Sequence, residues 1–173
     1  MSVKYRTYCK KAPKTRVSRK LIGSHLNKPG GGLWGCRGDE WIEWCTENNF
    51  RMNDWKECFE WELKKGAKVL TIRSVSGFVK LIKKYFKYIK VEGLPCYGTI
   101  DFEKIAKEYD AIELTDVPVQ ELHFGVKVDK HISISEYLDH GRQIAYNIGT
   151  NCWDVPSICV LNTDKVKVLR RLK

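Results

Sequence analysis

Residues 28–35 have the sequence Lys-Pro-Gly-Gly-Gly-Leu-Trp-Gly, and residues 39–45 continue with Asp-Glu-Trp-Ile-Glu-Trp-Cys. Three glycines after a proline allow the backbone to adopt positive φ angles and to approach a neighbouring group closely. Leu33 and Trp34 then place two apolar side chains at the end of this loop. The combination favours the wall of a pocket for a flat, partly charged ligand, with backbone N–H groups pointing inward. A glycine-rich hairpin with Trp34 in the core is the alternative, and this stretch alone leaves both open.

The chain has 173 residues, which is enough for one hydrophobic core without disulfides or metals. We therefore expect a single domain over residues 1–173. No apolar run approaches the roughly 20 residues that span a bilayer, and the N-terminal residues lack the apolar region of a signal peptide. Seven cysteines are scattered without a Cys-x-x-Cys pair, which argues against a disulfide framework and a zinc site. The sequence thus predicts free thiols, no metal, no membrane partner and a cytoplasmic location, meaning the bacterial host cytosol if a phage encodes the protein.

The formal net charge is +10 at pH 7, and it is unevenly distributed. Residues 1–37 contain no acidic residue, residues 80–87 and 165–173 are also basic, and residues 39–62 are rich in acids. Such a surface attracts anionic partners, which include nucleic acid, an acidic protein and a phosphate-bearing cofactor. A solvated basic face without a binding role is the alternative. The candidate target-binding residues belong to a basic arm (residues 9–28) and to the middle run: Lys10, Lys11, Lys14, Arg16, Lys83, Lys84 and Lys87.

Short strands and helices are expected along the chain in an irregular order. Glu57–Leu63 alternates apolar and acidic residues with the period of a half-buried strand, and a Lys64–Gly66 turn leads into a second strand over Lys68–Ile72. Helices are expected after Asp39 as N-cap, over Ser76–Tyr88, over Asp101–Lys107, and from Ser133 or Ser135. Further strands are expected at Val3–Tyr8, Tyr109–Leu114, Ser157–Leu161 and Val166–Leu169. The pattern lacks the helix–strand alternation of a doubly wound sheet and predicts an α+β fold.

The common hydrolase and nucleotide-binding motifs are missing from the sequence. It contains no P-loop, no Gly-x-Gly-x-x-Gly that opens a helix, no Gly-x-Ser-x-Gly and no His-Glu-x-x-His. Its four histidines are spaced too irregularly to indicate a metal site. The chemistry must therefore be sought in other residues.

Five segments, taken in order, resemble a known group of proteins. They are Tyr5–Thr7, the 28–34 loop, Trp41–Cys45, Ile100–Glu113 and Trp153–Asn162. Their order and spacing, which can be written KPxGGLW … YDxIE … WDxxS, look like small phage and bacterial proteins with an ADP-ribosyltransferase-like fold. The resemblance covers nearly the whole chain. It implies a split antiparallel β-sheet that holds NAD, as substrate, in a cleft, with flanking helices on the outside.

The resemblance also implies roles for individual residues in NAD binding. A polar residue on the first strand contacts the ribose on the nicotinamide side in such folds, and Arg6, with Thr7 beside it, has that position. Many relatives carry a histidine there, so Arg6 is a departure from the pattern. The loop residues Gly31, Gly32, Leu33 and Trp34 are expected against the nicotinamide or the diphosphate. Lys28 or Arg37 would hold the phosphate charge.

A carboxylate is needed because cleavage of the nicotinamide–ribose bond passes through an oxocarbenium-like state. Many relatives carry a catalytic glutamate on the last core strand, but here that strand begins with Ser157. The nearest acid is Asp154, which is the first candidate for the catalytic residue, and Glu113 is the second. Asp110 is a further choice. Capping of a turn before Pro156 is the alternative role for Asp154.

The function predicted from these residues is an NAD-dependent ADP-ribosyltransferase, which is a glycosyltransferase, acting on a macromolecule. The target is a nucleic acid or a host or defence protein, and a phage counter-defence or toxin-type role fits both. One alternative is a non-catalytic nucleic-acid-binding or inhibitor protein on the same fold. Another is a glycosylase that removes a DNA base or sugar without NAD.

Overall fold

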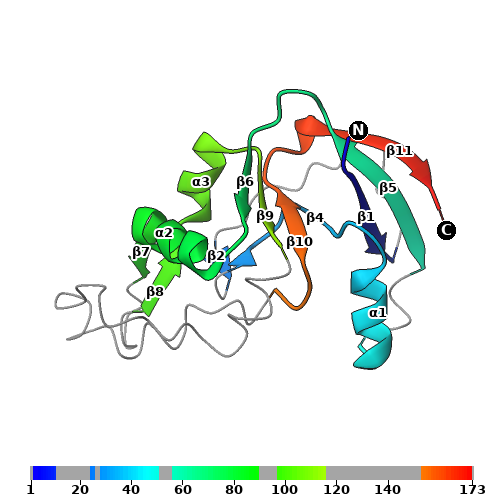
Figure 1. The fold of residues 1–173 in the computed structure, drawn as a ribbon, viewed down its shortest axis with the longest axis horizontal. Coiled ribbons are helices and arrows are strands. Elements are labelled where there is room, and N and C mark those ends of the chain that lie inside the picture. The colour runs from blue at the N-terminus through cyan, green and yellow to red at the C-terminus, as the bar shows by residue number, and fades with distance from the viewer. Residues whose placement is uncertain are drawn as a thin grey trace.

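The computed structural model describes residues 2–10, 24–25, 28–50, 56–89, 97–115 and 153–172. These residues form a mixed α+β structure with two main sheets and three α-helices (Figure 1). The helices are α1 (Glu40–Glu47), α2 (Val75–Tyr85) and α3 (Phe102–Glu108), and a 3₁₀ turn spans Thr163–Lys165. The strands are β1 (Lys4–Cys9), β2 (Ser24–His25), β3 (Lys28–Pro29), β4 (Leu33–Gly35), β5 (Glu57–Leu63), β6 (Val69–Ile72), β7 (Phe86–Ile89), β8 (Tyr97–Ile100), β9 (Ala111–Leu114), β10 (Ser157–Val160) and β11 (Val166–Arg171).

The strands divide between a three-stranded sheet and a four-stranded sheet. The first has the order β1-β5-β11 and the second the order β4-β10-β9-β6. Among the described strands, every pairing is antiparallel except that of β6 with β9. The Lys64–Gly66 turn therefore does not close a hairpin, because the chain leaves the first sheet there and enters the second. The split of the sheet agrees with the expected α+β class.

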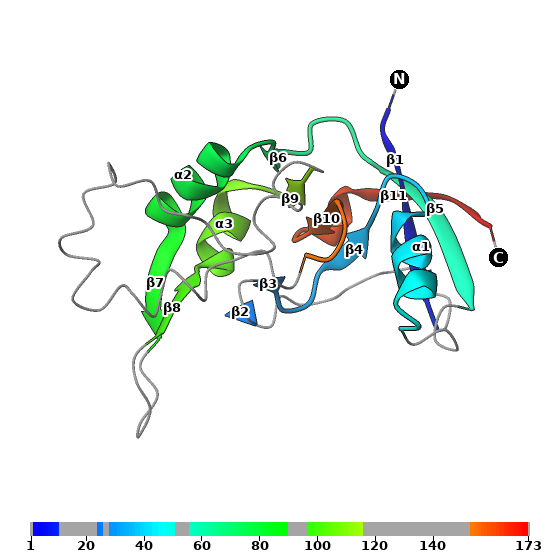
Figure 2. The same ribbon diagram turned by 60° about the horizontal axis from the view of Figure 1, so that its bottom comes forward.

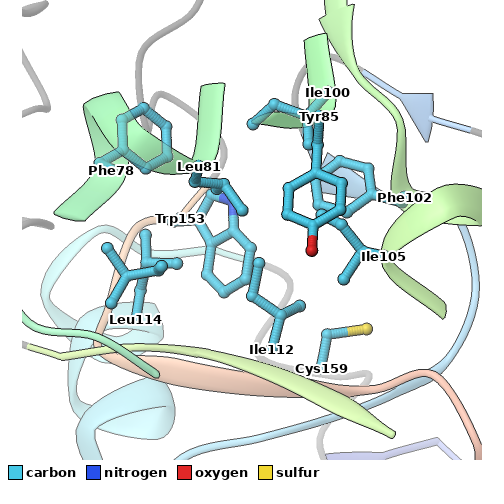
Figure 3. Close-up of a cluster of buried hydrophobic side chains, with 11 residues drawn as sticks. Phe78, Leu81, Tyr85, Ile100, Phe102, Ile105, Ile112, Leu114, Trp153 and Cys159 are labelled. Atoms are coloured by element: carbon cyan, nitrogen blue, oxygen red, sulfur yellow. The ribbon is translucent and has the colours of Figure 1, made fainter. Parts of the chain in front are cut away.

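Helices α2 and α3 cover one side of the four-stranded sheet (Figure 1). Each begins at a side chain that caps its first turn: Ser74 accepts a hydrogen bond from the Gly77 amide, and Asp101 accepts one from the Lys104 amide. Their apolar faces meet the sheet in a core that contains Phe78, Leu81, Tyr85, Ile112 and Trp153 (Figure 3). Helix α2 ends at Tyr85, earlier than the expected Tyr88, because Phe86 turns into β7.

A second core lies between the two sheets. Tyr5 and Trp61 of the three-stranded sheet stack with ring centroids 4.9 Å apart. Ala111, Ile158 and Val160 face them from the four-stranded sheet. The four-stranded sheet is therefore buried on both sides, which explains why all four residues of β9 are buried.

Within the described residues, one backbone bridge joins the two sheets. The amide of Arg6 donates to the carbonyl of Cys36 at 2.7 Å, and the amide of Cys36 donates to the carbonyl of Arg6 at 3.0 Å. This approach depends on Gly35, because a Cβ atom there would lie 2.6 Å from Cζ2 of Trp61 and 3.1 Å from the Arg6 carbonyl oxygen. Gly35 is thus required where the sheets meet.

The elements expected from the sequence are mostly confirmed within two or three residues at their ends. The strands at Val3–Tyr8, Glu57–Leu63 and Ser157–Leu161 appear as β1, β5 and β10, and the helix over Asp101–Lys107 appears as α3. Asp39 does precede α1, but the expected side-chain cap is wrong. Its carboxylate forms an ion pair with Arg6 and accepts a hydrogen bond from the Tyr8 hydroxyl, and it accepts none from the first amides of the helix. The expected helix from Ser133 or Ser135 and most of the basic arm lie outside the described residues.

Gly35→Ala should destabilise the protein by roughly 1–3 kcal/mol, because the added methyl group must displace the Trp61 ring or the β1 backbone. Gly77→Ala is the matched control, since its Cβ would lie 3.4 Å from Oγ of Ser74 and 3.7 Å from Cγ2 of Ile72, and alanine favours the helix by roughly 1 kcal/mol. Urea unfolding of both variants measures the difference. Equal stability of the two variants would mean that Gly35 is not required at the junction.

Candidate functional site

A cavity of about 230 Å³ opens where the two sheets separate beyond the Arg6–Cys36 bridge. Its walls come from β1, β4, the start of α1 and the segment that leads into β10, which lie next to one another in Figure 2. The lining residues are Arg6, Thr7, Tyr8, Cys9, Leu33, Trp34, Gly35, Cys36, Trp41, Trp153, Asp154, Val155 and Ser157. Of the predicted site residues, this cavity brings together Arg6, Thr7, Leu33, Trp34 and Asp154.

Three tryptophans give the cavity flat apolar surfaces. Trp34 and Trp153 meet edge to face, with ring centroids 4.8 Å apart. The indole N–H of Trp34 donates to the Gly31 carbonyl at 3.0 Å, which fixes the ring relative to the glycine loop. Trp41 reaches the cavity from α1, where it stacks on Trp44. Such surfaces suit a flat aromatic group.

The cationic group of the cavity is held in place by an ion pair. The guanidinium of Arg6 lies 2.6 Å from the Asp39 carboxylate, which also accepts a hydrogen bond from the Tyr8 hydroxyl. The hydrogen bond from Arg6, and then the one from Tyr8, lowers the pKa of Asp39. Burial and then the bond to Asp39 raise the pKa of Tyr8, so this phenol stays neutral and donates. Arg6 is therefore oriented before any ligand binds.

Thr7 has a hydroxyl that is already engaged on both sides. It donates to the Trp34 carbonyl oxygen at 2.5 Å and accepts from the indole N–H of Trp61 at 2.8 Å. These bonds tie β1 to β4 beside the cavity. Thr7 thus shapes the wall, and its oxygen retains one lone pair for a ligand.

Asp154 provides the only carboxylate among the described residues that line this cavity. It is half-buried between Trp153 and Val155, both of which are buried. Ser157 lines the cavity at the start of β10, the strand on which the resemblance leads one to expect a catalytic glutamate.

Glu113, the second predicted acid, lies in a different cavity of about 170 Å³. Its side chain is buried and accepts hydrogen bonds from the Tyr5 hydroxyl at 3.1 Å and from Arg37 at 2.7 and 3.0 Å. Burial and then the neighbouring Glu113 raise the pKa of Tyr5 to about 12. Arg37 thus contacts a carboxylate, where the sequence suggested a phosphate.

Three further predicted residues have positions outside the first cavity. Gly31 and Gly32 adopt positive φ angles of 98° and 69°. A Cβ on Gly32 would lie 2.7 Å from Sγ of Cys159 and from the Val160 carbonyl oxygen, so this glycine packs against β10. Asp110 accepts bonds from the Lys68 amide at 2.9 Å and the Asn162 side chain at 2.8 Å, which gives it a structural role. For Lys28 the structure describes the backbone, in β3, but not the side chain.

The basic residues predicted to bind a target are only partly available. Lys83 is exposed, but Lys84 pairs with Glu108 at 2.6 Å and Lys87 pairs with Asp101 at 3.4 Å. The bond to Glu108 raises the pKa of Lys84. Lys10 is exposed, whereas Lys11, Lys14 and Arg16 lie outside the described residues. Two of the three lysines predicted in the middle run, Lys84 and Lys87, are therefore ion-paired, which reduces the positive charge that this run offers to a target.

Sequence reasoning missed Tyr8, Asp39, Trp41 and Trp153 as parts of the site. Tyr8 follows Arg6 by two residues, so the strand period places both side chains on one face. Their shared partner, Asp39, is 31 residues from Tyr8 in the sequence, and a local pattern does not indicate such a contact. Within the described ranges, no cluster of His, Cys, Asp or Glu could hold a metal, and no helix has the length and apolarity to cross a membrane.

Comparison of the chain with protein-family models, curated proteins and solved structures gave no match.

The Arg6–Asp39 pair predicts a specific pH dependence of stability. Because the pKa of Asp39 is lowered on folding, its contribution is present above its unfolded value of about 3.9 and is lost as the pH falls through the folded value. Asp39→Asn should therefore lower the thermal midpoint at pH 7 and have a smaller effect near pH 2.

Asp164→Asn, at an exposed position on the 3₁₀ turn, is the control for loss of one negative charge. Thermal unfolding at both pH values measures the effect. An Asp39→Asn effect of the same size at both values would contradict the role of the ion pair.

Proposed function

We propose that this protein is an NAD-dependent ADP-ribosyltransferase that modifies a macromolecule. The observation that carries the proposal is the first cavity, where a fixed guanidinium, aromatic surfaces and one carboxylate meet at the junction of two sheets. Arg6 supplies the guanidinium, Leu33 and Trp34 supply apolar and aromatic surface, and Asp154 supplies the carboxylate. They are among the residues to which the sequence resemblance gives roles in NAD binding and cleavage.

The size of the cavity favours binding of one end of NAD, the ADP-ribose donor. Pockets for whole drug-sized ligands measure roughly 300–1,000 Å³, whereas this cavity measures about 230 Å³. It therefore suits the nicotinamide and its ribose, with the adenosine half outside. Trp34, Trp41 and Trp153 offer surfaces for the nicotinamide ring, and Arg6 offers N–H donors to ribose or phosphate oxygens.

The reaction requires stabilisation of positive charge on the ribose. The bond between C1 of the ribose and the nicotinamide nitrogen breaks, its electron pair leaves with neutral nicotinamide, and the sugar passes through an oxocarbenium-like state. A fixed carboxylate stabilises this state more than the ground state, because the charge develops only as the bond breaks. Asp154 is the carboxylate assigned to this role.

The first experiment measures NAD binding by calorimetry and nicotinamide release with and without DNA, RNA and cell lysate. Saturable binding together with release is the expected result. Absence of binding at millimolar NAD would overturn the proposal. The net charge of +10 would then favour a non-catalytic nucleic-acid-binding protein, with an affinity that falls steeply with salt.

Asp154→Asn should reduce the rate of nicotinamide release roughly 10²–10³-fold, because it removes the charge while preserving the shape of the side chain. Asp164→Asn removes the same charge from an exposed position outside the cavity and should release nicotinamide at the unmodified rate. Single-turnover release with saturating NAD measures both. Full activity of Asp154→Asn would show that another group stabilises the sugar cation.

A further inference from the structure

The second cavity lies directly across the Arg6–Cys36 bridge from the first. Tyr5 and Arg37, on one side of the bridge, line the second cavity, and Thr7 and Gly35, on the other side, line the first. Ser157 lines both. One crevice between β1 and the 154–157 segment is thus divided into two compartments that meet at Ser157.

The second compartment contains a buried carboxylate with unused hydrogen-bonding capacity. Only 5% of Glu113 is exposed. Tyr5 and Arg37 both donate to its Oε1 atom. Among the described residues, Oε2 accepts a hydrogen bond from the Thr71 hydroxyl at 3.4 Å. Oε2 can therefore accept a further N–H group from a ligand.

The rest of the lining restricts the ligand that fits beside Glu113. Leu114 and Pro156 supply apolar surface, and Glu40 supplies a second carboxylate. Arg37 supplies guanidinium donors, and about half of its side chain is exposed. A ligand edge with an amino group next to a ring nitrogen or carbonyl oxygen satisfies the carboxylate and the guanidinium together.

We propose that this second compartment is the acceptor site and that it takes an amino-bearing nucleobase (adenine, cytosine or guanine) of a nucleic acid. The net charge of +10 favours a polyanionic carrier for that base. The inference rests on the proposed function, because the donor is NAD in the neighbouring compartment.

The transfer step assigns Glu113 as the general base. The base nitrogen forms a bond to C1 of the ribose as the bond from C1 to nicotinamide breaks. The electron pair of the broken bond leaves with nicotinamide, and the proton of the attacking N–H group passes to the Glu113 carboxylate. Two compartments that meet at Ser157 allow the two reactants to approach from different sides.

The first test needs no NAD. Fluorescence polarisation with single-stranded oligo-dC and oligo-dT compares a base that has an amino group with one that has none. Oligo-dC should bind roughly tenfold more tightly, as expected for one well-placed donor–acceptor contact. Glu113→Gln should abolish this preference. Glu108→Gln, which changes an ion-paired glutamate on α3 outside the cavity, is the control and should retain it. Equal binding of the two oligonucleotides would overturn the inference.

Thr115→Phe provides a second variant, in case the loss of the buried Glu113 charge prevents folding. Thr115 is half-buried directly after β9 and lines the second compartment but not the first. The larger side chain should fill that compartment. The preference for oligo-dC should again disappear, and thermal unfolding of each variant verifies that it is folded. A folded Thr115→Phe protein with the full preference would place the base elsewhere and overturn the inference.

The second test separates this inference from the proposed function. The protein is incubated with labelled NAD and oligo-dC, oligo-dT or an arginine-containing peptide, and nicotinamide release and label transfer are measured together. Release with label on oligo-dC, and at least tenfold less on oligo-dT, is expected. Release with label on the peptide or equally on both oligonucleotides overturns the acceptor site but not the transferase. No release with any acceptor overturns the transferase itself and, with it, the transfer step.

Discussion

The Arg6–Cys36 bridge is the constraint on which the rest of the structure depends. Two backbone hydrogen bonds at this residue pair join the two sheets, and the Thr7 hydroxyl adds a bond to the Trp34 carbonyl. In the described part of the chain, no backbone ladder continues between β1 and β4. A longer ladder between the strands would close the crevice, because paired strands lie only about 4.8 Å apart. Without any bridge, the apolar core of Tyr5, Trp61 and Ile158 would lose its alignment. A single bridge satisfies both requirements, and Gly35 provides the space for it.

The alternation of side chains along β9 then separates packing from chemistry. Ile112 and Leu114 point into the core beneath α2 and α3, whereas Ala111 and Glu113 face the three-stranded sheet. Burial of a carboxylate is costly unless charged and polar partners compensate for the lost water. Arg37 and Tyr5 supply that compensation from the residues next to the bridge. The position of Glu113 is therefore tolerated only because β1 and the segment after β4 meet at this point.

The sequence predicted local structure better than the partnership of distant segments. The period-2 alternation of Glu57–Leu63 and the Asp101 cap are local signals, and the structure confirms both. Asp39 has the right place for a helix cap, but its carboxylate pairs with Arg6, because a tertiary ion pair competes with a local bond and cannot be seen in a linear pattern. The resemblance grouped eight residues around NAD: Arg6, Thr7, Lys28, Gly31, Gly32, Leu33, Trp34 and Asp154. Five of them, namely Arg6, Thr7, Leu33, Trp34 and Asp154, line one cavity, whereas Gly31 and Gly32 do not. The resemblance did not indicate that Glu113 lies beyond a bridge, because that depends on the register between β1 and Cys36.

The ion pair between Arg6 and Asp39 has its main value in orientation. Both side chains are partly exposed, at 30% and 47%, and ion pairs of this kind contribute only about 0–1 kcal/mol to stability. The pair joins Arg6, the bridge residue on β1, to Asp39, which precedes α1. Trp41 and the guanidinium therefore hold fixed positions on neighbouring walls of the cavity. Ordering these groups before a ligand arrives lowers the entropic cost of binding. Because Arg6 is already paired with Asp39, it adds little net charge to the cavity. An anionic ligand would therefore be held by hydrogen bonds from the oriented N–H groups of Arg6, and general electrostatic attraction would contribute less.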